Sequence, residues 1–124
     1  MTNQNRETLF TNLIRRTLAK MPSDFATWVL KKIVFIFPKE ENLATTIHRN
    51  ESKHYEAVIC LFDDLLTKDE SIQEFSLLHE IAHVKLKHKT QNDTEKKRKQ
   101  ENEANVLAMK WLTDGRIEES RKHG

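Results

Sequence analysis

The chain has 124 residues, of which 37% are apolar and 32% charged, and its formal net charge is +2. This length favours one domain, and a net charge so near zero gives no indication of a protein that binds nucleic acid or a membrane surface. Both glycines lie near the C-terminus and there is one cysteine, which excludes an upstream glycine-rich phosphate loop, an intrachain disulfide and a thiolate-rich zinc finger. With no signal peptide and no membrane-spanning run, the protein is expected to be soluble and cytoplasmic.

The first half of the chain predicts two helices followed by three strands. Apolar residues recur at helical spacing over 4–20, a Met-Pro pair ends that helix, and a short second helix follows over 23–29. Three runs rich in β-branched, aromatic or other apolar residues come next and predict strands over 33–37, 44–49 and 56–62. Strands as short as these fit a small antiparallel or mixed sheet.

The second half of the chain predicts two helices separated by a loop. The helical period returns over 69–87, with acidic residues in the first turn and lysines in the last, as the helix dipole favours. Residues 90–98 are polar and dense in charge, which predicts a mobile loop. A final helix is expected over 99–113, followed by a frayed tail over 115–124. The order of helices, strands and helices predicts one α+β domain spanning 1–124.

The first of these two helices carries a metal-binding motif. His79-Glu80-Ile81-Ala82-His83 matches the pattern H-E-x-x-H. Residues four apart share one face of a helix, so both imidazoles can reach one metal ion. Glu80 is close enough to contact a water on that ion without binding the ion itself. The motif lies inside an apolar helix and not in a polar loop, which favours a zinc site over two solvated histidines.

Catalytic zinc needs a third ligand from the protein. A third histidine at the metzincin spacing would fall at Lys89, so that class is excluded, and His88 is expected to face solvent. Two carboxylates on the final helix are candidates. Glu101 is favoured because it shares a helix face with small alanines that allow close approach, whereas Glu103 is the alternative and is expected to face solvent. Asn105, one turn after Glu101, is expected to accept the free N–H of a ligand histidine.

Together, H-E-I-A-H over 79–83 and E-N-E-A-N-V-L-A over 101–108 resemble the motifs of the ImmA/IrrE-type zinc metallopeptidases. The patterns of that family are H-E-[IL]-[AG]-H and E-x-E-A-N-x-F-A, and the likeness covers about residues 55–112. A wider similarity is to the gluzincins, in which a Glu on a second helix is the third ligand and an Asp or Asn one turn later supports a histidine. Leu107 stands where the family has Phe, and Trp-Leu-Thr over 111–113 replaces its Leu-Leu-Met-Pro.

The resemblance implies a minimal zincin-like domain with one Zn²⁺ per chain. It also implies a strand that lines the substrate cleft, which in this sequence comprises Ala57, Val58, Ile59 and Cys60. We expect this strand to lie at a sheet edge and to capture an extended substrate segment by pairing with it. The activity implied is that of an endopeptidase, and the partner implied is a protein substrate, a transcriptional regulator such as a repressor, met in trans.

The ligand set also predicts the mechanism. Zinc held by the two histidines and the glutamate would lower the pKa of a bound water to about 7 and polarise a peptide carbonyl. Glu80 would take the proton of this water and return it to the leaving amine. No residue is an obvious stabiliser of the oxyanion, and His48, His54 and Tyr55 are the candidates from the strand region.

Two other functions stay open. Residues 85–99 hold seven Lys or Arg, as the phosphate-binding patch of a nucleic-acid-binding protein would. A solvated segment is favoured because no aromatic residue lies among these cations to stack on bases. The other alternative is a zinc-containing module that binds proteins without cleaving them, such as an anti-repressor, and the intact Glu80 argues against it.

Overall fold

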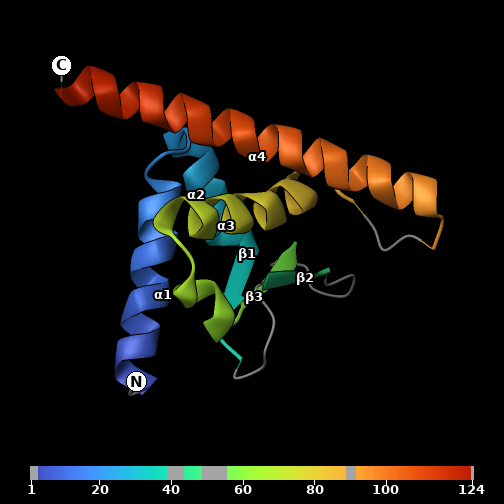
Figure 1. Cartoon of the computed structure of the whole chain (residues 1–124), viewed down its shortest axis with the longest axis horizontal. Helices are drawn as coiled ribbons and strands as arrows, with labels where there is room; N and C mark the ends of the chain where they lie inside the picture. The colour runs from blue at the N-terminus through green and yellow to red at the C-terminus, as the bar shows by residue number, and fades with distance from the viewer. Residues whose placement is uncertain (1–2, 39–43, 49–55, 89–91, 124) are drawn as a thin grey trace.

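The chain forms helices and one small sheet (Figure 1). The computed structural model describes residues 3–38, 44–48, 56–88 and 92–123. The elements in chain order are α1 (Asn3–Leu18), α2 (Ser23–Lys32), β1 (Ile33–Ile36), β2 (Ala44–His48), β3 (Ala57–Leu61), the 3₁₀-helix η1 (Asp63–Thr67), α3 (Glu70–Lys85) and α4 (Thr94–His123). The prediction of an α+β class is therefore confirmed.

Strand β3 lies at the centre of the sheet. It pairs in parallel with β1, where Ile33 is opposite Ala57, and antiparallel with β2, where His48 is opposite the same residue. Each strand begins and ends within one residue of its predicted limits. The sheet is therefore mixed, with β1 and β2 as the outer strands among the described residues.

The prediction that Ala57, Val58, Ile59 and Cys60 lie at a sheet edge is wrong. Both sides of β3 are paired, one with β1 and the other with β2, so this strand offers no edge to a substrate segment. Its sequence explains the position, because the run A-V-I-C-L does not alternate between apolar and polar residues. A continuous apolar run is typical of a strand covered on both faces, and Ala57, Ile59 and Cys60 are indeed buried.

Helix α3 occupies the middle of the hydrophobic core. Its Leu77, Leu78 and Ile81 are fully buried, and the helix packs against α1, α4 and β2. Phe10 and Leu13 contribute the buried side chains of α1 to the same core. Figure 1 shows α3 running beneath α4 and across the upper end of α1. None of the described helices has an apolar stretch of the length that a bilayer requires.

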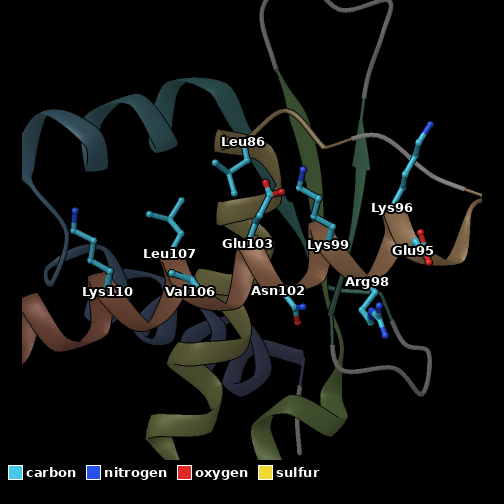
Figure 2. A pocket seen from close by; sticks show the side chains of 10 residues that line it. All are labelled: Leu86, Glu95, Lys96, Arg98, Lys99, Asn102, Glu103, Val106, Leu107 and Lys110. Atoms are coloured by element: carbon cyan, nitrogen blue, oxygen red, sulfur yellow. The ribbon is translucent and has the colours of Figure 1, made fainter.

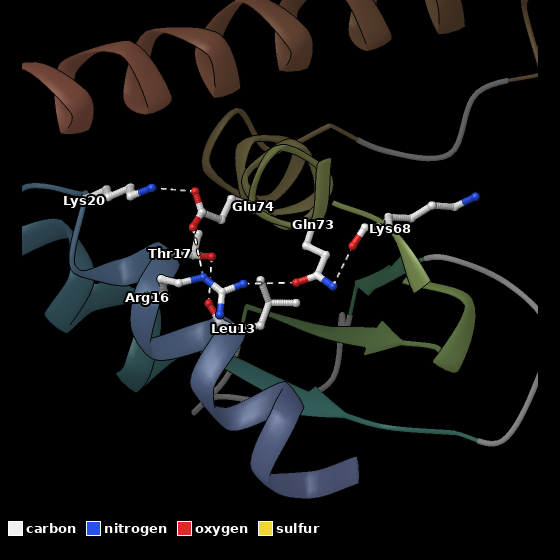
Figure 3. A network of polar contacts seen from close by, with 7 residues as sticks. All are labelled: Leu13, Arg16, Thr17, Lys20, Lys68, Gln73 and Glu74. Carbon is white, nitrogen blue, oxygen red and sulfur yellow. Dashed lines mark hydrogen bonds and ion pairs between the residues drawn. The ribbon is translucent and has the colours of Figure 1, made fainter. Parts of the chain in front are cut away.

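A group of polar side chains fixes α1 against the beginning of α3 (Figure 3). The Glu74 carboxylate is buried and accepts from the Arg16 Nε at 3.0 Å and from the Lys20 Nζ at 2.6 Å. Beside it, the Gln73 Oε1 accepts from the Arg16 Nη2 at 3.0 Å. The Gln73 amide in turn donates to the backbone oxygens of Leu66 and Lys68. Because buried charges must be paired, these contacts set the position of α3 on α1.

Helix α4 is longer at both ends than predicted. It begins at Thr94, so most of the expected mobile loop over 90–98 is helical, while residues 89–91 lie outside the described part of the chain. The reason is a helix cap: the Asp93 Oδ1 accepts from the backbone N–H groups of Glu95 and Lys96. The helix also continues to His123 in place of the frayed tail over 115–124, because one glycine within a helix costs only about 1 kcal/mol.

Candidate metal centre

Two histidines on α3 and one glutamate on α4 meet between these helices. His79 and His83 lie one helical turn apart, and their Nε2 atoms are 3.1 Å from each other. Glu101 reaches both of them across the helix interface, with its Oε2 3.0 Å from the His79 Nε2 and its Oε1 3.1 Å from the His83 Nε2. The structure therefore brings together the three residues that the sequence predicted as metal ligands.

Small residues on α4 allow this approach of the two helices. Ala104 lies three residues after Glu101, Ala108 lies four residues after Ala104, and both are fully buried. Trp111 and Leu112 continue the buried side of α4, and α3 and α4 share the most extensive contact between any two elements in the described part of the chain. With larger side chains at the alanine positions the helices would be further apart, and the Glu101 carboxylate would not reach the two rings.

The three side chains fit a metal ion. Two imidazoles and one carboxylate are a ligand set of catalytic zinc, and zinc bonds of about 2.0–2.1 Å place tetrahedral donor atoms roughly 3.3 Å apart. The Nε2 atoms of His79 and His83 lie 3.1 Å apart, and each lies 3.0–3.1 Å from a different Glu101 carboxylate oxygen, close to that spacing. Both histidines are largely buried, whereas Glu101 is about half exposed. The site is thus formed mainly by α3 and is open to solvent on the side of α4.

Burial lowers the pKa of His83 below its ordinary value of 6.5, and the neighbouring His79 lowers the pKa further. The Glu101 carboxylate acts in the opposite direction, but the net direction of the shift is downward. A lowered pKa keeps the His83 imidazole neutral at neutral pH, and a histidine must be neutral to bind a metal ion.

We expect the zinc-free protein to lose stability as the pH falls below 6.5. The pKa of His83 is lower in the folded than in the unfolded state, so the unfolded state binds more protons in this range. The contribution is present above pH 6.5 and is lost as the pH decreases through the folded-state pKa. Urea unfolding in the presence of a chelator, from about pH 8 to pH 5, measures this slope. His83→Gln should reduce the slope, and equal slopes for both proteins would contradict the assignment to His83.

Glu80 lies on α3 directly after His79 and is half-buried. It follows a candidate ligand histidine on the helix that carries two of the three converging side chains. The role of Glu80 as a general base stays a prediction.

The prediction that His88 faces solvent is wrong, whereas Glu103 is exposed as predicted but also contacts His88. The His88 side chain is 9% exposed, its Nδ1 lies 2.9 Å from the His83 Nδ1, and its Nε2 lies 3.2 Å from the Glu103 Oε2. The helical geometry assumed for His88 does not apply, because α3 ends at Lys85 and Lys87 adopts a left-handed conformation with φ 57°. This turn brings the His88 N–H to the His83 carbonyl oxygen at 3.0 Å. Lysine has no preference for this conformation, so no signal in the sequence indicated it.

The structure does not place Asn105 beside a ligand histidine. Its side chain is exposed, and the partner of the His83 Nδ1 is His88. The His79 Nδ1 is buried without a hydrogen-bond partner among the described residues. Of the oxyanion candidates, His54 and Tyr55 lie outside the described residues, and His48 is described only by its backbone at the end of β2.

A groove of about 800 Å³ lies along the N-terminal half of α4 (Figure 2). Its lining combines the exposed apolar side chains of Leu86 and Val106 with basic ones, including Lys96 and Lys99. Glu103 belongs to this lining and also contacts His88, so the groove extends to one side of the metal centre. Part of the basic segment noted in the sequence therefore forms a wall of a groove.

Residues 71–123 match the model of the family Peptidase U49. The matched segment covers a little under half of the chain and contains nearly all of α3 and α4, with His79, Glu80, His83 and Glu101. No significant match was found among curated proteins or among solved structures. The resemblance to the ImmA/IrrE-type metallopeptidases stays a prediction. The part of the chain that builds the candidate metal centre is similar to a peptidase family, which supports a peptidase function in general.

Proposed function

We propose that the protein is a zinc-dependent endopeptidase with a minimal zincin-like fold. The observation that carries the proposal is the convergence of His79, His83 and Glu101 from two helices onto one point. This ligand set is found in catalytic zinc sites, which keep one position for water. The match of the same two helices to a peptidase family supports the same reaction class.

The residues have separate roles in the proposed reaction. His79 and His83 would hold zinc through their Nε2 atoms and Glu101 through its carboxylate. When bound, zinc supplies Lewis-acid chemistry that makes water more acidic and a peptide carbonyl more electrophilic. The Glu80 carboxylate takes a proton from the attacking water. It then gives that proton to the amide nitrogen as the C–N bond breaks, so that the products are a free carboxylate and a free amine.

The position of β2 supports a substrate bound as an extended segment. Among the described strands β2 is an outer one, paired on one side with β3, and it packs against α3, the helix of the H-E-x-x-H motif. Its second side can therefore accept a strand from a substrate near the metal centre. We assign to β2 the capture of substrate that the sequence had suggested for β3. The groove along α4 offers further apolar and basic surface for a protein substrate. A regulatory protein such as a repressor remains our proposed substrate.

We expect Glu101→Ala to weaken zinc binding by at least about 10-fold, because the loss of a ligand should exceed the loss of a residue that merely supports one, which costs 10–100-fold. Competition with a coloured chelator measures the affinity. Asn102→Ala, at the exposed neighbouring position, is the matched control and should bind zinc like the wild type. Wild-type protein that holds less than about 0.2 zinc per chain after purification with zinc would contradict the proposal.

A further inference from the structure

His88 lies between a candidate metal ligand and a carboxylate. Its Nδ1 is 2.9 Å from the Nδ1 of His83, and its Nε2 is 3.2 Å from the Oε2 of Glu103. The His88 backbone N–H also donates to the His83 carbonyl oxygen at 3.0 Å. His88 is thus attached to His83 at both the main chain and the side chain, and α4 supports it from the other side through Glu103.

The two ring contacts allow one arrangement of protons once His83 binds a metal. A histidine that binds through Nε2 carries its proton on Nδ1. The His83 Nδ1–H must then donate to the His88 Nδ1, which is unprotonated. A neutral His88 consequently carries its proton on Nε2 and donates it to the Glu103 Oε2. Each ring nitrogen from the metal site to Glu103 has a defined role in this chain of hydrogen bonds.

We infer that His88 is a positioning residue that fixes the tautomer and the ring orientation of His83, and that Glu103 fixes His88 in turn. The inference rests on the proposed metal site. Ligand histidines in proteins are usually oriented by a hydrogen bond at the nitrogen that does not bind the metal. His83 has such a partner, whereas the buried His79 Nδ1 has none among the residues that the structure describes. His83 is therefore the candidate ligand whose ring orientation a neighbouring side chain fixes.

The two glutamates of the E-N-E segment, Glu101 and Glu103, then have distinct roles. Glu101 contacts the Nε2 atoms at which a metal would bind, and Glu103 contacts the far side of His88. Both glutamates reach the end of α3 because α4 passes alongside it. The left-handed conformation of Lys87 turns the chain after α3 back toward His83 and so places His88 between His83 and Glu103.

Substitutions at His88 that differ in hydrogen bonding test the inference. His88→Gln keeps an oxygen that can accept from the His83 Nδ1–H, whereas His88→Leu has a similar volume and no acceptor. We expect His88→Leu to bind zinc about 10–100-fold more weakly than the wild type and His88→Gln to retain most of the affinity. Glu103→Ala should show a smaller loss, because it acts only through His88. Asn105→Ala, an exposed position on α4, is the control and should leave zinc affinity unchanged.

The His83 Nδ1–H is the readout that a merely structural role would not change. In the zinc-bound protein this proton should exchange slowly with solvent in the wild type and in His88→Gln, because a hydrogen bond holds it, and rapidly in His88→Leu. ¹H–¹⁵N spectra of the imidazole rings measure this exchange. Equally slow exchange in His88→Leu, or equal loss of zinc affinity in the Leu and Gln variants, would overturn the inference. Failure of the wild type to bind zinc would instead contradict the proposed function, and with it the inference.

Discussion

Glu80→Gln is expected to retain zinc and to lose cleavage of the protein substrate. Glutamine has nearly the same shape as glutamate but cannot take a proton from water. Proton transfer by a positioned side chain contributes about 10²–10⁴-fold to the rate, and a misplaced water adds to the loss. Zinc content should stay at the wild-type level, because the residue is not one of the three converging donors.

Co-expression with candidate regulatory proteins, followed by intact-mass analysis, measures the cleavage, and elemental analysis of the same samples measures the zinc. Glu70→Gln is the matched control, since Glu70 is an exposed glutamate in the first turn of the same helix. The control should cut the partner at the same bond as the wild type. The same fragments from Glu80→Gln and the wild type, or no fragments with any partner, would favour a zinc-containing protein that binds without cleaving.

His79→Ala and His83→Ala are each expected to abolish zinc binding and to remove the effect of zinc on thermal stability. The candidate ligands belong to two helices, so a bound ion stabilises the contact between α3 and α4. An ion present at about 100 times its dissociation constant adds roughly 2.7 kcal/mol to the free energy of unfolding. In a chain of this length that corresponds to a melting temperature higher by about 10 °C.

Thermal unfolding with and without a chelator provides the measurement. Chelation should lower the melting temperature of the wild type and of Ser71→Ala, an exposed position on α3, and should leave both histidine variants unaffected. A wild-type melting temperature that does not respond to chelation would show that no ion connects the two helices.

Local signals in the sequence located most of the elements. The strand limits are within one residue of the predicted ones, and α3 lies inside its predicted range, because apolar periodicity and turn residues act over short distances. The convergence of the three candidate ligands could also be predicted, since helical spacing places His79 and His83 on one face and the alanines of α4 indicate the side on which Glu101 lies.

Other features depended on information that is not local. The order β1-β3-β2 is set by pairing between distant segments, so an apolar run alone did not show that β3 is central. The length of α4 was underestimated because charged residues were interpreted as a loop, although Lys, Arg, Glu and Gln are good helix formers and Asp93 caps the helix. The position of His88 depended on one left-handed residue, Lys87, which the sequence does not mark.

The buried Glu74 means that the N-terminal helix helps to hold in place the helix that carries two of the three candidate metal ligands. This carboxylate stands on α3 five residues before His79, and both of its cationic partners, Arg16 and Lys20, come from the first twenty residues of the chain. A fragment reduced to the family-matched residues 71–123 would lack both cationic partners of Glu74 and would expose to solvent the apolar side chains that α3 buries against α1. The segment that is similar to a peptidase family is therefore not expected to fold alone, because its motif helix packs against an N-terminal helix that supplies none of the three candidate ligands.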